Sequence, residues 1–171
     1  YGFRLEYWGT STILVVWAAV FLVFAKNAPQ TARPKSLSEM LGVLAREPLA
    51  WALSAFYFLT FGGFVAFSIY LPTLLRDQFN LGPADGGFRT AGFVVLATLC
   101  RPLGGWLSDR IGGSRVLSWI FPAVAAFGLL LGVESMLPFT VGALGCAALL
   151  GIGNGAVFQL VPRYFPTERA T

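Results

Sequence analysis

The chain has 171 residues, of which 56% are hydrophobic and only 12% are charged, and its mean hydropathy is +0.70. Soluble domains usually carry about 25% charged residues, so this composition excludes an ordinary soluble domain and indicates a membrane protein. The net charge is +4, but its basic residues are not interleaved with aromatic residues on one face, so no nucleic-acid partner is expected.

Five apolar stretches follow one another along the chain, each near or above the ~20 residues that a helix needs to cross the hydrocarbon core. They are too long, and alternate too little between polar and apolar residues, to be the strands of a β-barrel. The sequence therefore predicts an all-α, polytopic transmembrane helical bundle with about five transmembrane helices. The stretches cover residues 8–25, 49–75, 90–108, 116–133 and 137–162.

The basic residues predict which side of the membrane each loop occupies. If all five stretches span, eight basic residues fall on one side and three on the other, and positive loops stay in the cytoplasm. The long polar segment 26–48 is therefore expected to be cytoplasmic. The eight are Lys26, Arg33, Lys35, Arg46, Arg110, Arg115, Arg163 and Arg169, and the three are Arg4, Arg76 and Arg89.

Within that polar segment, residues 36–46 (SLSEMLGVLAR) predict a short surface helix. Ser36 and Glu39 have the spacing of a capping box, and the leucines and methionine that follow recur at helical spacing. Such a helix is expected to lie in the cytoplasmic interface as an ordinary linker between two bundles.

The second stretch is rich in aromatic residues. Tyr57, Phe61 and Phe64 are spaced at i, i+4 and i+7 and so share one helix face. Taken alone, such a stripe is more often packing or lipid contact than a binding site.

The fifth stretch combines glycines with two amides. Gly142, Gly145, Gly151, Gly153 and Gly155 would allow a neighbouring backbone to approach closely. Asn154 and Gln159 either hydrogen-bond across helices or reach a polar cavity, and the sequence leaves both possibilities open.

Arg101 is the unusual residue of the chain, because it lies inside an apolar stretch. It is roughly 18 Å along the helix from Arg89 and roughly 12 Å from Asp109, beyond a comfortable snorkelling reach. A charge at that depth costs at least ~2.5–3.5 kcal/mol, and no acidic residue lies deep in any of the five stretches. Its fork of N–H donors suits a flat oxyanion, and the Tyr57 and Phe61 rings could sandwich a planar ligand.

The segment that follows Arg101, PLGGWLSDRIGGSR, resembles the cytoplasmic loop motif G-x-x-x-D-R-x-G-x-R of the major facilitator superfamily. Gly105, Asp109, Arg110 and Gly112 match the motif, whereas Ser114 replaces its last basic residue and Arg115 comes one place late. In that superfamily the loop contributes helix-end and charge contacts that change as the two halves of the protein rock.

Within the superfamily the chain resembles the nitrate/nitrite porters. The resemblance rests on the segments YFLTFGGFVAFS (57–68), CRPLGGWLSDRIGG (100–113) and GIGNGAVFQLVP (151–162). It implies that residues 1–25 form the last helix of the N-terminal half and that residues 26–48 form the central cytoplasmic loop. Residues 49–171 would then hold helices seven to ten. We expect a partial chain, because it opens on Tyr1 and stops in a charged segment before helix eleven.

The resemblance also implies a substrate site. Arg101 matches the eighth-helix arginine that binds the anion in that family, and Tyr57 and Phe61 match aromatic residues of its seventh helix. Phe158 corresponds to a tenth-helix aromatic residue, and we place Asn154 with it as a candidate binding residue. The implied protein is a multi-pass cell-membrane transporter that moves nitrate, nitrite or both by alternating access. Its expected partners are that small inorganic anion, membrane lipid and the remaining helices of the same transporter.

Other functions remain as alternatives. A facilitator for another small anion, such as a carboxylate, would keep Arg101 without needing the aromatic sandwich. A membrane subunit without transport activity would instead pair Arg101 with an acid on another helix. An enzyme is not expected, because the sequence has no histidine, metal cluster, nucleophile–base arrangement or phosphate loop. Cys100 and Cys146 lie in separate stretches and indicate no disulfide, and no cofactor is expected.

Overall fold

The computed structural model describes residues 2–26, 36, 38, 41–42 and 46–165. Within these residues the regular structure is entirely helical, and five helices are long and apolar enough to cross a membrane. This confirms the all-α prediction and the expected number of spans. Each helix includes most of the predicted apolar stretch and is generally longer, because helical hydrogen bonding continues into the polar ends that the hydropathy pattern leaves out.

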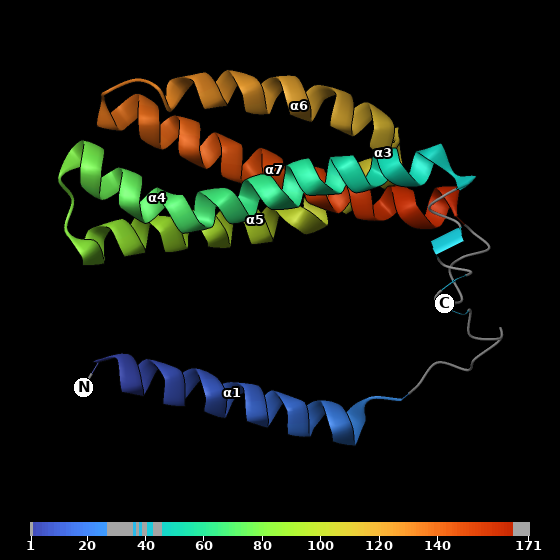
Figure 1. Cartoon of the computed structure of the whole chain (residues 1–171), viewed down its shortest axis with the longest axis horizontal. Helices are drawn as coiled ribbons and strands as arrows, with labels where there is room; N and C mark the ends of the chain where they lie inside the picture. Colours follow the sequence, from blue (N-terminus) through green and yellow to red (C-terminus); the bar gives the residue numbers. More distant parts are fainter. Residues whose placement is uncertain (1, 27–35, 37, 39–40, 43–45, 166–171) are drawn as a thin grey trace. The chain divides into compact units, whose positions relative to one another are not determined.

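The chain forms two units. The first contains α1 (Gly2–Phe24), and the second contains the other four spans, which run alongside one another (Figure 1). One of these spans is a single long helix made of α3 (Pro48–Tyr57), the π-helix η1 (Phe58–Gly62) and α4 (Gly63–Phe79). The other three are α5 (Pro83–Ile111), α6 (Gly113–Leu130) and α7 (Met136–Tyr164).

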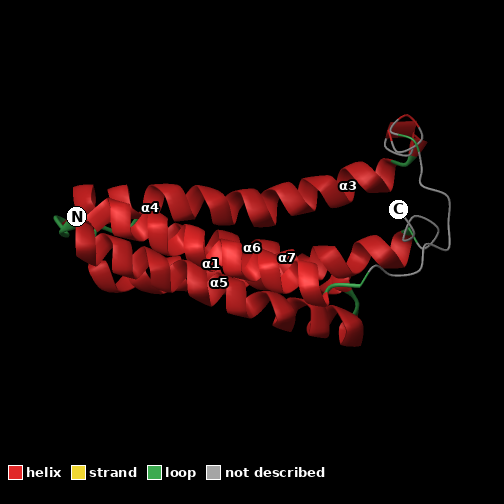
Figure 2. Cartoon of the chain, turned by 90° about the horizontal axis from the view of Figure 1, so that it is seen from below, coloured by secondary structure: helices red, strands yellow, loops and turns green. Residues whose placement is uncertain are grey.

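The connections within the second unit are short. Asn80–Gly82 joins α4 to α5, Gly112 alone joins α5 to α6, and residues 131–135 join α6 to α7. Asn80 ends α4 in the left-handed conformation, with φ 53°. Gly112 has φ +90°, a conformation that glycine adopts without steric cost, so the chain reverses there with a single residue. These short connections keep sequential helices antiparallel (Figure 1), and the helices run along one common direction in the turned view as well (Figure 2).

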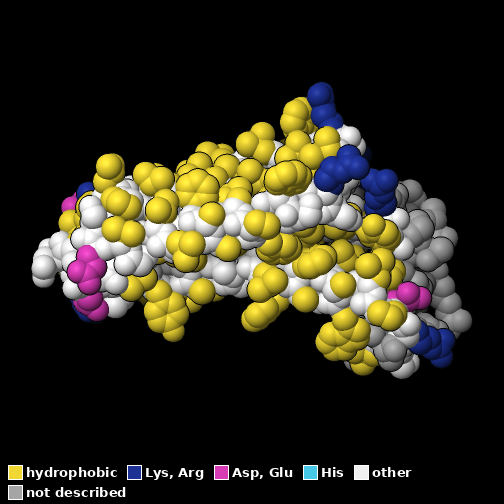
Figure 3. Space-filling model, turned by 90° about the horizontal axis from the view of Figure 1, so that it is seen from above, with side chains coloured by type: hydrophobic (Ala, Val, Ile, Leu, Met, Phe, Trp, Pro, Cys, Tyr) yellow, Lys and Arg dark blue, Asp and Glu magenta, His cyan; other side chains and the backbone are white. Residues whose placement is uncertain are grey.

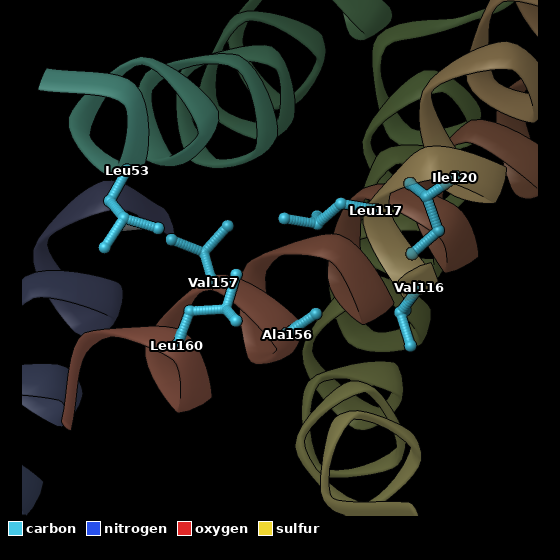
Figure 4. Close-up of a cluster of buried hydrophobic side chains, with 7 residues drawn as sticks. All are labelled: Leu53, Val116, Leu117, Ile120, Ala156, Val157 and Leu160. Atoms are coloured by element: carbon cyan, nitrogen blue, oxygen red, sulfur yellow. The ribbon is translucent and has the colours of Figure 1, made fainter. Parts of the chain in front are cut away.

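Two buried apolar clusters hold the four spans together. The first lies among α3, α6 and α7, where the side chains of Leu53, Leu117 and Val157 point toward one another (Figure 4). The second lies among α4, α5 and α7 and consists of Leu71, Leu75, Phe93, Ala97, Phe139 and Ala147. Because the clusters occupy opposite ends of the long helix, η1 lies at the level between them.

Charged side chains gather toward the two ends of the spans, and hydrophobic side chains cover the surface between (Figure 3). At the end of the spans near Asn80, which we call the Asn80 end, Arg76 pairs with Asp77 at 3.0 Å, and Arg89 lies 4.0 Å from Asp85. Asp109, Arg110 and Arg115 lie at the opposite end, which we call the Pro48 end. An apolar belt between two charged ends fits a helix bundle in a bilayer.

The predicted interfacial helix at 36–46 falls largely outside the described residues, including Glu39 of the expected capping box. Of that segment, Ser38, Leu41, Gly42 and Arg46 are helical.

Candidate functional site

Arg101 lies in the C-terminal half of α5, beside the η1 turn at the level between the two apolar clusters. Its side chain is half-buried, and its Nε atom is buried with no hydrogen-bond partner in the described part of the chain. Neither ion pair found among the described residues involves Arg101. No carboxylate from the described part of these spans therefore pairs with the guanidinium.

Aromatic rings provide the surroundings of that charge. The Arg101 Cζ atom lies 5.0 Å from the centre of the Phe64 ring and 5.8 Å from that of Phe61. Ring faces carry negative electrostatic potential, and a desolvated cation–π contact contributes about 2 kcal/mol. Such contacts stabilise the cation but do not neutralise it, so it can still attract an anion.

The rings continue in a chain of contacts on both sides of the arginine. Phe61 stacks on Tyr57 with centroids 5.2 Å apart, and Tyr57 meets the Phe158 ring edge-to-face at 5.4 Å. On the other side, Phe64 stacks on Phe93 at 6.2 Å. This confirms that Tyr57, Phe61 and Phe64 share one face of their helix. The structure thus joins four of the five predicted binding residues in one series of contacts: Phe158, Tyr57, Phe61 and Arg101.

A π-helical turn lies within the aromatic stripe. Residues Phe58–Gly62 form it, and the Thr60 hydroxyl donates to the carbonyl oxygens of Phe56 at 2.9 Å and Tyr57 at 3.3 Å. Thr60 is fully buried, and a Cβ atom added to Gly153 of α7 would lie 2.8 Å from its Cγ2. The missing side chain at Gly153 therefore lets α7 approach the turn that carries Tyr57 and Phe61. Single π-turns inside α-helices are frequent at functional sites.

The backbone of Arg101 is held against α7. A Cβ atom on Gly155 of α7 would overlap the carbonyl oxygen of Arg101, and one on Gly151 would overlap that of Ala97. From α5, a Cβ atom on Gly104 would overlap the carbonyl oxygen of Ile152. We call this contact the α5–α7 seam. It confirms the close approach expected for the glycines of α7 and fixes the depth of Arg101 relative to that helix.

Asn154 lies on the same face of α7 as Phe158, which is four residues further along. Only 2% of Asn154 is exposed, and its Nδ2 donor has no hydrogen-bond partner among the described residues. No hydrogen bond joins it to Arg101 within that part of the chain. Buried amides normally find partners, so this free donor marks Asn154 as a candidate ligand-binding group.

The loop-motif residues lie together at the Pro48 end. Asp109 accepts a hydrogen bond from the Gln159 amide of α7, so Gln159 bonds across helices, one of its two expected roles. The Arg110 guanidinium lies 4.3 Å from the Trp106 ring centre, and Gly112 makes the turn into α6. A Cβ atom on Gly105 would meet nothing within 4 Å in the described structure. The close helix contact in this segment comes from the neighbouring Gly104.

Sequence reasoning placed Phe64 on the aromatic face but did not include it among the binding residues, and it did not single out Phe93 or Gly104. Its spacing, i+7 from Tyr57 and i+3 from Phe61, would have been enough to add Phe64 to the candidate binding residues. Nothing local distinguishes Phe93 from the other phenylalanines, because its contact depends on how α4 and α5 pack.

Comparison with known proteins gives several relatives. The chain is 42% identical over 157 residues to the "Nitrite extrusion protein" of Bacillus subtilis, covering 91% of this chain and 40% of the relative. It is 37% identical over 158 residues to the "Probable nitrate transporter NarT" of Staphylococcus epidermidis, again covering 91% and 40%. It is 40% identical over 153 residues to the "Probable nitrate/nitrite transporter NarK2" of Mycobacterium tuberculosis, covering 87% and 38%.

The chain thus spans about two fifths of the length of the curated relatives it matches. No solved structure matches it significantly. The family model of the Major Facilitator Superfamily matches residues 1–171, the whole sequence. Together with five apolar helices of spanning length, this match identifies a multi-pass protein of the cell membrane. The chain therefore belongs to the Major Facilitator Superfamily.

Proposed function

We propose that this chain is part of a transporter that moves nitrate, nitrite or both across the cell membrane by alternating access. The substrate class is supported by relatives whose names specify nitrate or nitrite, at 37–42% identity over about nine tenths of the chain. Alternating access is the usual mechanism of secondary transporters built from two halves around a midplane site.

The proposal depends most on the surroundings of Arg101. Its guanidinium lies over two phenylalanine rings, and its Nε atom has no hydrogen-bond partner within the described residues. Intramembrane charges are costly and normally pair with one another, with backbone carbonyls or with a ligand. A small anion would supply the missing negative charge, and the planar fork of arginine matches the planar oxygens of nitrate.

The neighbouring residues supply the rest of the proposed site. The Phe61 and Tyr57 rings offer flat apolar walls to a planar ion, and the Tyr57 hydroxyl offers one neutral donor. The buried Nδ2 of Asn154 offers a second neutral donor, and Phe158 borders the Tyr57 ring. Few donors in an apolar surround would favour a small, weakly hydrated anion over a larger or more strongly hydrated one.

The helices fit a simple placement in the whole transporter. In it, residues 1–25 form the last helix of the N-terminal half, 26–48 the cytoplasmic central loop, and 49–171 helices seven to ten. The Pro48 end is then cytoplasmic, which agrees with the excess of basic residues on that side. The hydrogen bond between Asp109 and Gln159 would tie the loop motif to α7 within this half.

The test is Arg101→Lys in the full-length transporter. Lysine keeps the positive charge but loses the fork of donors, so nitrate and nitrite uptake should be abolished while expression and membrane insertion stay near normal. Arg89→Lys is the matched control, because Arg89 is exposed on the same helix near its Asn80 end and should tolerate the change. Normal uptake by the Arg101→Lys protein would refute the assignment of the site.

Anion competition identifies the substrate. Unlabelled nitrate and nitrite should compete with labelled nitrate, whereas acetate and formate should compete at least tenfold less effectively. Equal competition by the carboxylates would make the protein a facilitator for small anions in general.

A further inference from the structure

Both contacts that the described structure gives the Arg101 guanidinium are cation–π contacts with phenylalanine rings. Phe64 and Phe61 meet the cation through their rings, at 5.0 and 5.8 Å from Cζ. A cation–π contact attracts the charge through the ring's quadrupole and does not pair the N–H donors with an acceptor oxygen. A carboxylate partner would instead occupy those donors. Ring contacts can therefore hold the arginine in place while its donors stay free for an anion.

Phe64 is the closer of the two rings, and it also packs against more deeply buried neighbours. Its ring stacks on Phe93, which is 1% exposed in α5, and Phe93 in turn stacks on Phe67 at 5.5 Å. The aromatic cluster therefore extends from the buried core to the arginine. Phe61 instead stacks on Tyr57, in the direction of the proposed anion site.

We propose that Phe64 is a positioning residue for the anion site, which holds the Arg101 guanidinium against its ring so that N–H donors stay directed at the substrate. This rests on the proposed function of Arg101 as the anion receptor. Without the Phe64 ring, the long arginine side chain can sample more rotamers, and ordering it again on binding lowers the affinity for the anion.

The chain offers a matched control for this role. Phe67 lies one turn further along α4 and stacks on the same Phe93 ring, but no cation–π contact joins it to Arg101 within the described structure. Removing the Phe67 ring disturbs the aromatic core without removing a cation–π partner. The pair of substitutions thus separates a packing effect from an effect on the arginine.

The experiment measures uptake kinetics of the full-length transporter with Phe64→Leu, Phe64→Tyr and Phe67→Leu. Phe64→Leu should raise the KM for nitrate roughly fivefold to tenfold, with the maximal rate per inserted molecule within about twofold of the unmodified protein. Phe64→Tyr keeps the ring face and should stay within about twofold in both constants. Phe67→Leu should leave the KM within about twofold even where it lowers the amount of protein inserted.

Phe64→Met, which fills similar volume without a ring, replaces Phe64→Leu if the leucine variant fails to insert, and the same rise in KM is expected. The proposal is overturned by an unchanged KM in the ringless variant, by equal rises for the Phe64 and Phe67 variants, or by a Phe64→Tyr protein as impaired as Phe64→Leu. If Arg101→Lys leaves uptake intact, the proposed function itself is wrong. If it abolishes uptake while Phe64→Leu is neutral, only the positioning role is wrong.

If the protein carries a different anion, the same comparison of KM is made with that anion.

Discussion

The two sides of α5 at Arg101 are built in different ways. Toward α7, backbone meets backbone, because Gly104, Gly151 and Gly155 have no side chains to keep the helices apart. Toward the long Pro48–Phe79 helix, side chain meets side chain, with rings stacked on rings and on the arginine. The peptide of Arg101 belongs to the first contact and its guanidinium to the second.

This difference separates two requirements that Arg101 must meet if it binds the anion as proposed. The seam leaves no room for adjustment, since each added Cβ atom would overlap a carbonyl oxygen, so it fixes where α5 lies. The aromatic face fixes how the side chain is presented, and rings can turn and shift without breaking the backbone contact. The proposed anion site should therefore respond to substitutions on the two sides in different ways.

The largest effect is expected at the seam. Gly104→Ala would place a methyl group against the Ile152 carbonyl, and overpacking of this kind typically costs about 1–3 kcal/mol. We expect a lower thermal stability of the purified full-length protein and less protein in the membrane. Uptake per inserted molecule would fall as well, because α5 carries Arg101 with it.

Gly92→Ala is the control for that experiment, since a Cβ atom there would meet nothing within 4 Å, and Gly92 lies on the same helix. Alanine also favours the helix by up to about 1 kcal/mol over glycine, so this variant should be as stable as the parent or more so. Equal stability of the Gly104 and Gly92 variants would mean that the seam is not a tight contact.

The seam shows how far the sequence could predict the fold. The five spans followed from hydropathy alone, since stretches of about 20 apolar residues have few other structures available in a bilayer. The glycines of residues 142–155 predicted a close approach, but not its partner. Gly155 packs against Arg101, and Gly104 packs against Ile152. Which residues meet in this way depends on the register between α5 and α7, which no local sequence pattern specifies.

The second effect concerns the π-turn that carries the aromatic face. Thr60→Val removes the buried hydroxyl that bonds the Phe56 and Tyr57 carbonyl oxygens and leaves the volume unchanged. Loss of such a bond in a buried site costs about 1 kcal/mol. We expect a moderate loss of thermal stability together with a rise in the KM for nitrate, because Tyr57 and Phe61 flank the turn.

Thr98→Val is its counterpart, since the Thr98 hydroxyl makes the same kind of bond, to Val94 at 2.8 Å, on an exposed face of α5. This variant should match the parent in KM. A Thr60→Val protein that also matches the parent would show that the hydroxyl does not maintain the aromatic face.

The part of the candidate site that could be predicted is the part around a charged residue in an apolar stretch. Arg101 stood out because nothing in its stretch compensates its charge, and the helical spacing of Tyr57, Phe61 and Phe64 gave their shared face. The π-turn was not predictable, because Thr60, Gly62 and Gly63 are also compatible with an unbroken α-helix. The importance of Phe64 over its neighbours became clear only from its distance to the arginine.

The smallest effect is expected from Tyr57→Phe, which keeps the ring contacts with Phe61 and Phe158 and removes one neutral hydroxyl. A neutral hydrogen bond contributes about 1 kcal/mol or less, so the KM for nitrate should rise by no more than about fivefold. Tyr70→Phe is the control, because Tyr70 is exposed on α4 away from the site. Uptake kinetics of the full-length transporter measure both variants. A loss from Tyr57→Phe as large as that from Arg101→Lys would move the main anion contact from the guanidinium to the tyrosine hydroxyl.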